Sequence, residues 1–275
     1  MVAEDLWSEA DEGALGEFVR ATSSDDLAGA LFAIDGLSAE AAAGARALRD
    51  AWARQVSRRT VERNPGVQAW ALANVLGGEL GFRLDERDFY APENGHLHQV
   101  LRRHRGLPIL LAAVWIEVGR RARARVEGIA LPGHFVARVG GEAGILVDPA
   151  AGGRSLTPAD CLRLVIDHEA TWQVEYLEAA PTPAVVERVL HNLLKAHELD
   201  GDFRGLYRAL RFLAALRPEE PAYLVDRAAL AVALGAHGHA AETLEEVARR
   251  FPFRSEGLLA GIQARGLRGT TKLPN

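Results

Sequence analysis

The first third of the chain has a helical pattern of apolar and polar positions. Residues 1–83 are rich in Ala and Leu, and this stretch is predicted to be helical. One long helix is predicted to begin after an N-cap at Ser38 and to stop at Asn64-Pro65. A second helix is predicted over about 67–80, where the pattern ends in glycines.

Two further helices are predicted before the pattern changes. Asn94 is a suitable cap for a helix that runs through Arg103. Gly106-Leu107-Pro108 then breaks and restarts the chain, and proline suits a first helical position because its missing N–H would have no acceptor within the helix. The helix from Pro108 to about Arg123 is apolar through its first turns, so we expect those turns to be buried.

From Val126 the pattern changes to short β-prone runs. VEGIA, HFVARV and GILVD are separated by turns that contain glycine, and residues 140–144 are predicted to form a hairpin loop. Thr157 as N-cap and Pro158 at the first helical position predict a return to helix. We therefore expect residues 84–180 to form a helix-plus-antiparallel-sheet core, which places the protein in the α+β class.

The tail after Pro181-Thr182-Pro183 is predicted to be entirely helical and internally repeated. A shift of 34 residues aligns six positions: Leu190 with Leu224, Gly201 with Gly235, Leu206 with Ala240, Leu210 with Leu244, Leu213 with Val247, and Pro218 with Pro252. This period is typical of tetratricopeptide helix pairs. We expect two domains, 1–180 and 181–275, with turns at Gly201 and Gly235. Seven tail positions are predicted to be buried: Leu190, Leu193, Leu210, Leu213, Leu224, Leu244 and Val247.

Two repeats bury little apolar surface by themselves. We therefore expect the tail to pack on the preceding domain, or on a helix from 258–268, and to offer its other face to a protein or peptide partner.

Composition and charge change this picture little. The 275 residues include 25% charged and 48% apolar residues, and the net charge of −5 does not favour nucleic acid or a membrane. The acidic opening lacks the features of a secretory signal, and the longest apolar run, 107–116, is too short to span a bilayer, so a cytoplasmic location is expected. Seven arginines gather between Leu101 and Glu127, where they form either an anion-binding patch or a solvated helix face.

Two strand residues carry the candidate chemistry. If the runs on either side of residue 141 form a simple hairpin, His134 and Asp148 face each other across it. The carboxylate would then accept a hydrogen bond from one imidazole nitrogen and leave the other to act as a base. Such a pair is two-thirds of a nucleophilic triad, or else a polar contact that stabilises the hairpin.

The chain offers no obvious third member. A nucleophile would be expected at a helix N-terminus, where backbone N–H groups lower a thiol pKa and form an oxyanion hole, but that position holds Pro108. Cys161 is the only cysteine, so no internal disulfide or cysteine-based zinc cluster can form, and its place in an amphipathic helix indicates a buried structural thiol. Ser155 is predicted to cap the helix that follows it.

These motifs resemble those of a known family. A helix that begins with G-x-C, then V-x-G, then GH opening one strand and DP ending the next, is similar to the transglutaminase core. The matching segments here are Gly106-Leu107-Pro108, Val126-Glu127-Gly128, Gly133-His134 and Asp148-Pro149. RRHRGLPI and LPGHF resemble the bacterial SirB-type subgroup, which joins such a core to a tetratricopeptide tail. The resemblance covers about residues 67–252 and implies the fold, with His134 and Asp148 in the triad positions and Pro108 in place of the cysteine.

Three functions are compatible with these features. The first is an interaction or regulatory protein in which a core without its nucleophile presents a cleft and the repeats recruit a partner. The second is a hydrolase or acyl-transfer enzyme that uses His134 and Asp148 with an unidentified nucleophile or an activated water. The third is a metal-dependent activity of His96, His98, His104 and His134, although no recognised ligand spacing is complete. No phosphate-loop or dinucleotide motif occurs, and no cofactor or metal is predicted.

Overall fold

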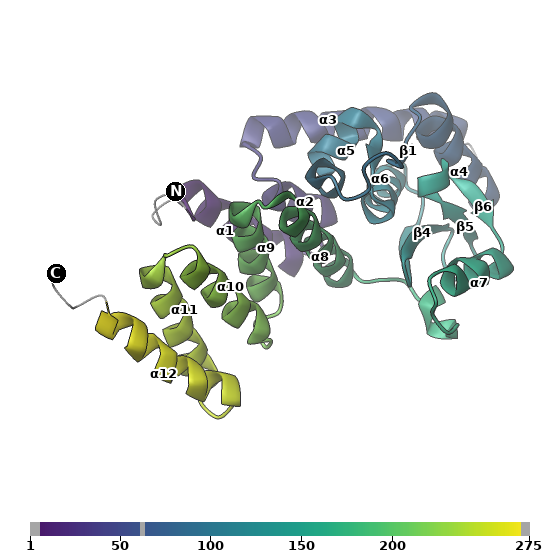
Figure 1. Cartoon of the computed structure of the whole chain (residues 1–275). Helices are drawn as coiled ribbons and strands as arrows, with labels where there is room; N and C mark the ends of the chain where they lie inside the picture. Colours follow the sequence, from purple (N-terminus) through teal and green to yellow (C-terminus); the bar gives the residue numbers. More distant parts are fainter. Residues whose placement is uncertain (1–5, 61–63, 271–275) are drawn as a thin grey trace. The chain divides into compact units, whose positions relative to one another are not determined.

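The computed structural model describes residues 6–60 and 64–270 (Figure 1). By contacts the chain divides into two compact units, Ala21–Val189 and Met1–Arg20 together with Leu190–Asn275. The sequence pattern predicted domains 1–180 and 181–275, so this division differs mainly in grouping the first 20 residues with the tail. The fold is α+β, as predicted, with helices surrounding a small antiparallel sheet.

In the described residues of the unit Ala21–Val189, seven helices and three short 3-10 turns form most of the helical part. The helices are α2 Leu27–Ile34, α3 Ala39–Arg59, α4 Pro65–Leu72, the π-helical η2 Ala73–Glu79, α5 Leu97–Arg103, α6 Pro108–Arg121 and α7 Pro158–Asp167. The 3-10 turns are η3 Pro92–Gly95, η4 Pro149–Ala151 and η5 Val174–Leu177. The first residues of α8, Thr182–Asp200, also belong to this unit.

Predicted starts at Ser38, Pro108 and Thr157 are found at α3, α6 and α7. Ser38 accepts a hydrogen bond from the backbone N–H of Ala41 at the start of α3. The described part of this helix ends at Arg59, and residues 61–63, predicted to continue it, lie outside the described residues. Asn64 instead caps α4, whose first residue is Pro65.

Asn94 does not have its predicted role as a cap. It lies in η3, it is fully buried, and α5 begins after His96 without a side-chain cap. Its amide nitrogen donates to the carbonyl of Asp88 at 2.6 Å, and its amide oxygen accepts from Arg103 at 2.9 Å. Both polar atoms of the amide are thus used across the loop, which leaves none for the helix end.

Four antiparallel strands form the sheet, in the order β3 Val126–Leu131, β4 His134–Val139, β5 Ile145–Asp148 and β6 Arg154–Leu156. The predicted hairpin loop at 140–144 joins β4 to β5. Strand β6 was not predicted: Ser155 pairs with Val147 in the ladder, and Thr157 caps α7 through a capping box with Asp160. The expectation that Ser155 caps this helix is therefore wrong.

The sheet carries a helix on each face. On one face, Gly128 leaves room for Phe135 and for Ile116 of α6, since a Cβ on Gly128 would come within 2.7 Å and 3.3 Å of them. On the other face, five strand residues form an apolar cluster with Cys161 and Val165 of α7: Ile129, Leu131, Val136, Leu146 and Leu156. As predicted, the helix that begins at Pro108 packs against the strands.

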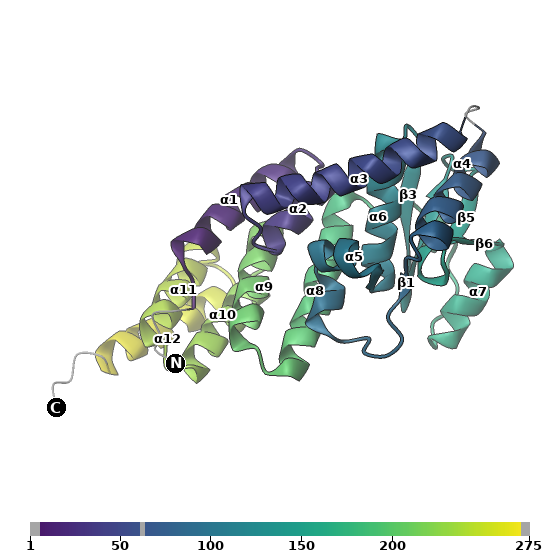
Figure 2. The ribbon, with the colours of Figure 1, turned by 90° about the horizontal axis from the view of Figure 1, so that it is seen from above.

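Helix α6 also packs against α3, which passes across it (Figure 2). Arg49 of α3 donates to Glu117 of α6 at 3.1 Å. Burial raises the pKa of Glu117 above its ordinary value, in spite of the nearby Arg120 and Arg49.

A second, two-stranded sheet was not predicted. Strand β1, Arg83–Leu84, pairs in parallel with β2, Arg105–Gly106. The two segments are far apart in sequence and each contains only two residues, so neither has a recognisable strand period. Their pairing joins the end of η2 to the start of α6.

The other unit is helical in its described residues. Its helices are α9 Phe203–Leu216, α10 Ala222–Ala233, α11 His237–Arg250 and α12 Ser255–Thr270, together with the end of α8 and the larger part of α1 Glu9–Ser23. Gly201 and Gly235 stand at the predicted turns with φ of 69° and 75°, a conformation that favours glycine. All seven tail residues predicted to be buried are buried.

The N-terminal helix supplies part of the core of this unit. The Phe18 ring packs edge-on against Phe212 with centroids 4.9 Å apart, and Asp11 forms ion pairs with Arg204 and Arg208. In the ranges that the structure describes, no helix combines the length and apolar character needed to cross a bilayer.

Candidate functional site

His134 and Asp148 come together at the ends of neighbouring strands. Nε2 of His134, the first residue of β4, lies 3.1 Å from Oδ1 of Asp148, the last residue of β5. The exposed fraction is 13% for the His134 side chain and 6% for that of Asp148. The contact is therefore short and largely shielded from water.

The register differs from the simple hairpin by two residues. Ala137 pairs with Val147, and the same ladder continued by one residue places Asp148 opposite Val136 rather than His134. Because side chains alternate along a strand, a shift of two keeps His134 and Asp148 on the same face, and they meet diagonally.

Asp148 has further partners. Its Oδ1 accepts hydrogen bonds from the backbone N–H groups of Ala150 and Ala151, at 3.0 and 3.3 Å, and so caps η4. Nδ1 of His134 has no hydrogen-bond partner in the described part of the chain. One ring nitrogen is thus oriented by a carboxylate, and the other is available to accept or donate a proton.

Arg188, on helix α8 outside the sheet, contacts the turn between β3 and β4. Arg188 donates to the carbonyls of Leu131 and His134, both at 3.0 Å, and its guanidinium lies over the Phe135 ring. Burial lowers the pKa of Arg188. This cation therefore holds the β3–β4 turn, and sequence reasoning missed it because Arg188 lies more than 50 residues along the chain.

The two helices that flank the sheet supply no nucleophile to the pair. Pro108 occupies the first position of α6, it is buried, and it has no side-chain group that could attack an electrophile. Strand alternation places His134 on the face of Val136, which α7 covers, whereas α6 covers the opposite face.

Cys161 lies on the same face of the sheet as His134 and Asp148, but its thiol is not accessible to solvent. Its side chain is fully buried in the apolar cluster beneath α7. Desolvation, with smaller contributions from Asp160 and Asp148, raises the pKa of the thiol. A neutral, buried thiol is a packing group rather than a nucleophile.

The comparisons with known proteins agree with this geometry. Residues 45–191, more than half of the chain, match the family model of the transglutaminase-like superfamily. The chain belongs to this superfamily. No solved structure matches it.

Several relatives of this transglutaminase-like chain carry names without an assigned reaction. A UPF0162 protein of Xylella fastidiosa is 31% identical over 189 residues, which cover 66% of this chain and 67% of that protein. A UPF0162 protein of Pseudomonas aeruginosa is 35% identical over 127 residues, or 45% of this chain and 46% of its own. F-box only protein 21 of Mus musculus is 28% identical over 177 residues, which cover 60% of this chain and 28% of that protein.

The four histidines considered as metal ligands lie at three different places in the transglutaminase-like core. His104 lies 2.6 Å from the carbonyl of Leu80, and His134 contacts Asp148. His96 and His98 instead converge on Asp35, and no group of three His, Cys, Asp or Glu suited to a metal ion forms among the described residues.

Asp35 is a second buried carboxylate with histidine partners. Nδ1 of His96 lies 2.9 Å from one oxygen, and the backbone N–H of His98 donates to the other at 2.8 Å. The ring of His98 is also 2.9 Å away, without the geometry of a hydrogen bond. Burial raises the pKa of Asp35, but the contacts with His96 and His98 outweigh it and hold the pKa below its ordinary value.

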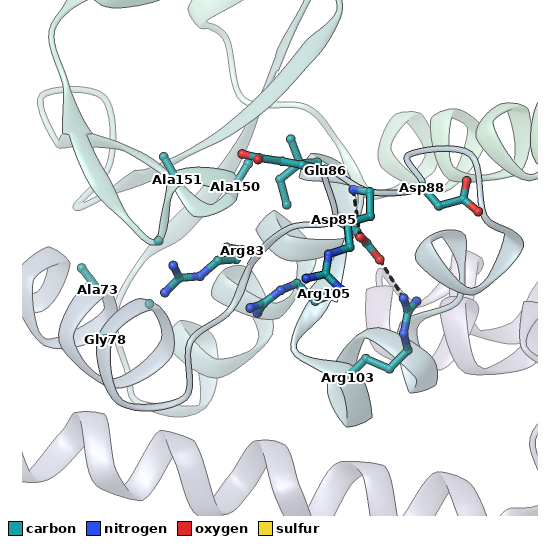
Figure 3. A pocket seen from close by; sticks show the side chains of 14 residues that line it. Ala73, Gly78, Arg83, Asp85, Glu86, Asp88, Arg103, Arg105, Ala150 and Ala151 are labelled. Carbon is teal, nitrogen blue, oxygen red and sulfur yellow. Dashed lines mark hydrogen bonds and ion pairs between the residues drawn. The ribbon is translucent and has the colours of Figure 1, made fainter.

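The predicted arginine cluster divides into two groups. Arg121 pairs with Asp50 and Arg125 with Glu127 on the surface, as expected of a solvated face. Arg103 and Arg105 instead line a cleft of about 1030 Å³, between η2, the segment 83–88 and η4 (Figure 3). Sequence reasoning did not single out Arg83 and Arg87, which also line this cleft. His134 and Asp148 are not among its lining residues, but η4, which Asp148 caps, forms one wall.

Proposed function

We propose that this protein is a noncatalytic interaction or regulatory protein: a transglutaminase-like core of the SirB-type subgroup, joined to tetratricopeptide-like repeats that bind a protein or peptide partner. The observation that carries the proposal is the missing nucleophile. The resemblance to the transglutaminase core puts Pro108 at the position of the family's cysteine, and the only thiol of the chain, Cys161, is buried, with a pKa that desolvation raises. His134 and Asp148 are then a stabilising contact that remains from a triad.

The helical tail supports a recruiting role. An apolar groove of about 520 Å³ lies between α10, α11 and α12, and its lining includes Val225, Val232, Leu244 and Leu267. Val232 is 39% exposed. Grooves between paired helices suit an amphipathic helix or an extended peptide, whose apolar side chains would cover these residues.

The noncatalytic part of the proposal is tested with electrophilic probes. The full-length chain is incubated with thiol- and hydroxyl-directed activity probes, and labelling is read by mass spectrometry beside His134→Ala and Cys161→Ser variants. We expect no labelling of the native protein above that of the two variants. Labelling that disappears in His134→Ala would reveal an activated nucleophile and contradict the proposal.

The recruiting part is tested by site-specific photo-crosslinking in cells. A photoreactive residue at Val232 in the groove is compared with one at Leu48, which is similarly exposed, at 45%, on α3. We expect one partner to be crosslinked from position 232 and not from 48, and Val225→Glu to abolish the crosslink. The same products from both positions would contradict a recruiting groove.

A hydrolytic function is the second candidate, and one observation favours it. Nδ1 of His134 is without a partner in the described part of the chain, while Nε2 is oriented by Asp148, which is how a general base that activates water is arranged. Hydrolysis of ester or amide substrates should then fall by about a hundredfold or more in His134→Ala. It should be unchanged in Cys161→Ser.

A further inference from the structure

The cleft of Figure 3 is rich in arginine. Its lining includes Arg83, Arg87, Arg103 and Arg105, together with the carboxylates of Asp85, Glu86 and Asp88. It is large enough to admit a small organic molecule rather than a single ion. The arrangement of these charges decides which ligand it fits.

The carboxylate of Asp85 is already occupied. Its Oδ2 accepts from Arg103 at 2.7 Å, and its Oδ1 accepts from the backbone N–H of Arg87 at 3.3 Å. Arg103 also donates to Asn94, the buried amide that holds the loop. Arg103 is therefore a structural cation, neutralised within the protein.

Arg83 and Arg105 are arranged differently. They are register partners in the parallel β1–β2 pair, so their Cα atoms stand side by side on adjacent strands, about 5 Å apart. Figure 3 shows both guanidinium groups extending in the same direction, into the cleft. Neither forms an ion pair with a carboxylate within residues 6–60 and 64–270.

Backbone carbonyls hold these two side chains in place. Arg105 donates to the carbonyls of Gly81 and His104, at 2.6 and 2.9 Å, and Arg83 makes a long contact of 3.4 Å with the carbonyl of Gly81. These contacts position the guanidinium groups without neutralising them. Two adjacent cations without a counter-ion repel each other, so an anion between them relieves the repulsion.

We propose that Arg83 and Arg105 form a binding site for a doubly charged oxyanion, either a phosphate monoester or a dicarboxylate, carried by a small molecule that occupies the cleft. Guanidinium groups bind such anions with paired hydrogen bonds, and two of them match two negative charges. This site is distinct from the tail groove and does not depend on the recruiting function proposed above.

The experiment is a calorimetric titration of the full-length protein at low ionic strength, with phenyl phosphate and with succinate as probes. We expect saturable binding of at least one probe, and the tighter of the two identifies the anion. Arg83→Gln should weaken that binding by about tenfold or more, because it removes a charge-assisted hydrogen bond. Arg83 is the preferred position because its contacts within the protein are few, so the fold should survive the change.

Arg102→Gln is the matched control. Arg102 is exposed on α5, precedes the lining residue Arg103 in the chain and is not itself among the lining residues, so the substitution removes the same charge without touching the site. Binding should remain within about twofold of the native value, because an exposed guanidinium outside the lining of the cleft forms no direct hydrogen bond with the bound anion. Arg105→Gln should weaken binding as Arg83→Gln does, with the melting temperature of each variant measured without ligand.

Two results would overturn the proposal. One is that neither phenyl phosphate nor succinate binds the native protein. The other is that Arg102→Gln and Arg83→Gln weaken binding equally, since this would reduce the effect to general attraction by positive charge.

Discussion

Asp148 serves two structural purposes at once. Its Oδ1 forms a hydrogen bond with Nε2 of His134 and accepts hydrogen bonds from two backbone N–H groups of η4. The carboxylate therefore connects the end of β5 to the wall of the cleft. His134 has only this one side-chain partner among the described residues. Loss of the Asp148 side chain would therefore leave more hydrogen-bonding groups without a partner than loss of the His134 side chain.

Asp148→Ala should destabilise the protein more than His134→Ala. The first leaves a ring nitrogen, the buried N–H of Ala150 and the partly buried N–H of Ala151 without an acceptor, at a cost of about 2–4 kcal/mol, while the second costs about 1 kcal/mol. Urea denaturation followed by tryptophan fluorescence, to which the buried Trp115 of α6 contributes, measures both losses. Equal losses would mean that the cap on η4 contributes nothing.

Asp35 gives the protein a defined sensitivity to acid. Its pKa is depressed in the folded state, so its stabilising effect is fully present above the unfolded pKa of about 4 and is lost as the pH falls through the folded value. Asp35→Asn should lower the melting temperature at pH 7, and this difference should shrink as the pH falls from about 5 toward 2.5. A difference that stays constant over this range would contradict the assignment.

Residue pairs close in sequence could be predicted, and distant ones could not. His134 and Asp148 lie on either side of one glycine-rich turn, so hairpin geometry sufficed to bring them together even with the register wrong by two. The contact of Asp35 with His96 spans 61 positions and has no local signal. The pairing of Arg83 with Arg105 was equally invisible, because two-residue strands have no period.

At the scale of elements, backbone proximity shapes the cleft. Helix η2 approaches the C-cap of η4 so closely that a Cβ on Gly77 would lie 1.8 Å from the carbonyl oxygen of Gly152, the C-cap residue. A Cβ on the neighbouring Gly78 would meet nothing nearer than 3.8 Å. Both glycines line the cleft, but only Gly77 is required for the close approach.

Gly77→Ala and Gly78→Ala therefore form a matched pair. The first should cost about 1–3 kcal/mol or more, because the backbone of η4 must shift. The second should be neutral or stabilising by up to about 1 kcal/mol, as is usual for glycine to alanine in a helix. Thermal unfolding compares them, and similar melting temperatures for the two variants would argue against the close packing of η2 on η4.

Elements with strong local signals agreed with their predictions. Ser38, Pro108 and Thr157 mark helix starts because caps and first-turn prolines act within one turn of helix. The π-helical continuation of α4 and the strand β6 were missed, since both depend on what packs against them rather than on their own residues. The prediction that Asn94 is a helix cap was wrong for the same reason. The local pattern does not reveal that the Asn94 amide forms hydrogen bonds with Arg103 and Asp88.

At the scale of the whole molecule, the two ends of the chain form one unit. No local pattern groups residues 1–20 with the tail, because the acidic opening and the helical tail share no motif. Their contacts are specific: Asp11, only 4% exposed, accepts from Ser8 and is paired with Arg204 and Arg208. Helix α1 thus contributes to the same unit as the helices of the tail.

Asp11→Ala in the full-length protein should loosen this unit. It removes the buried carboxylate that pairs with Arg208, a cation whose pKa burial lowers, and breaking such a pair costs about 3–5 kcal/mol. We expect faster hydrogen exchange in α9, which carries Arg204 and Arg208, with strand β4 unchanged. Glu12→Gln is the control: Glu12 pairs with Arg211 on the same pair of helices, but its side chain is 63% exposed, so the loss should stay below about 1 kcal/mol. If α9 exchanged at the native rate in Asp11→Ala, the N-terminal segment would be an accessory to the tail rather than part of its core.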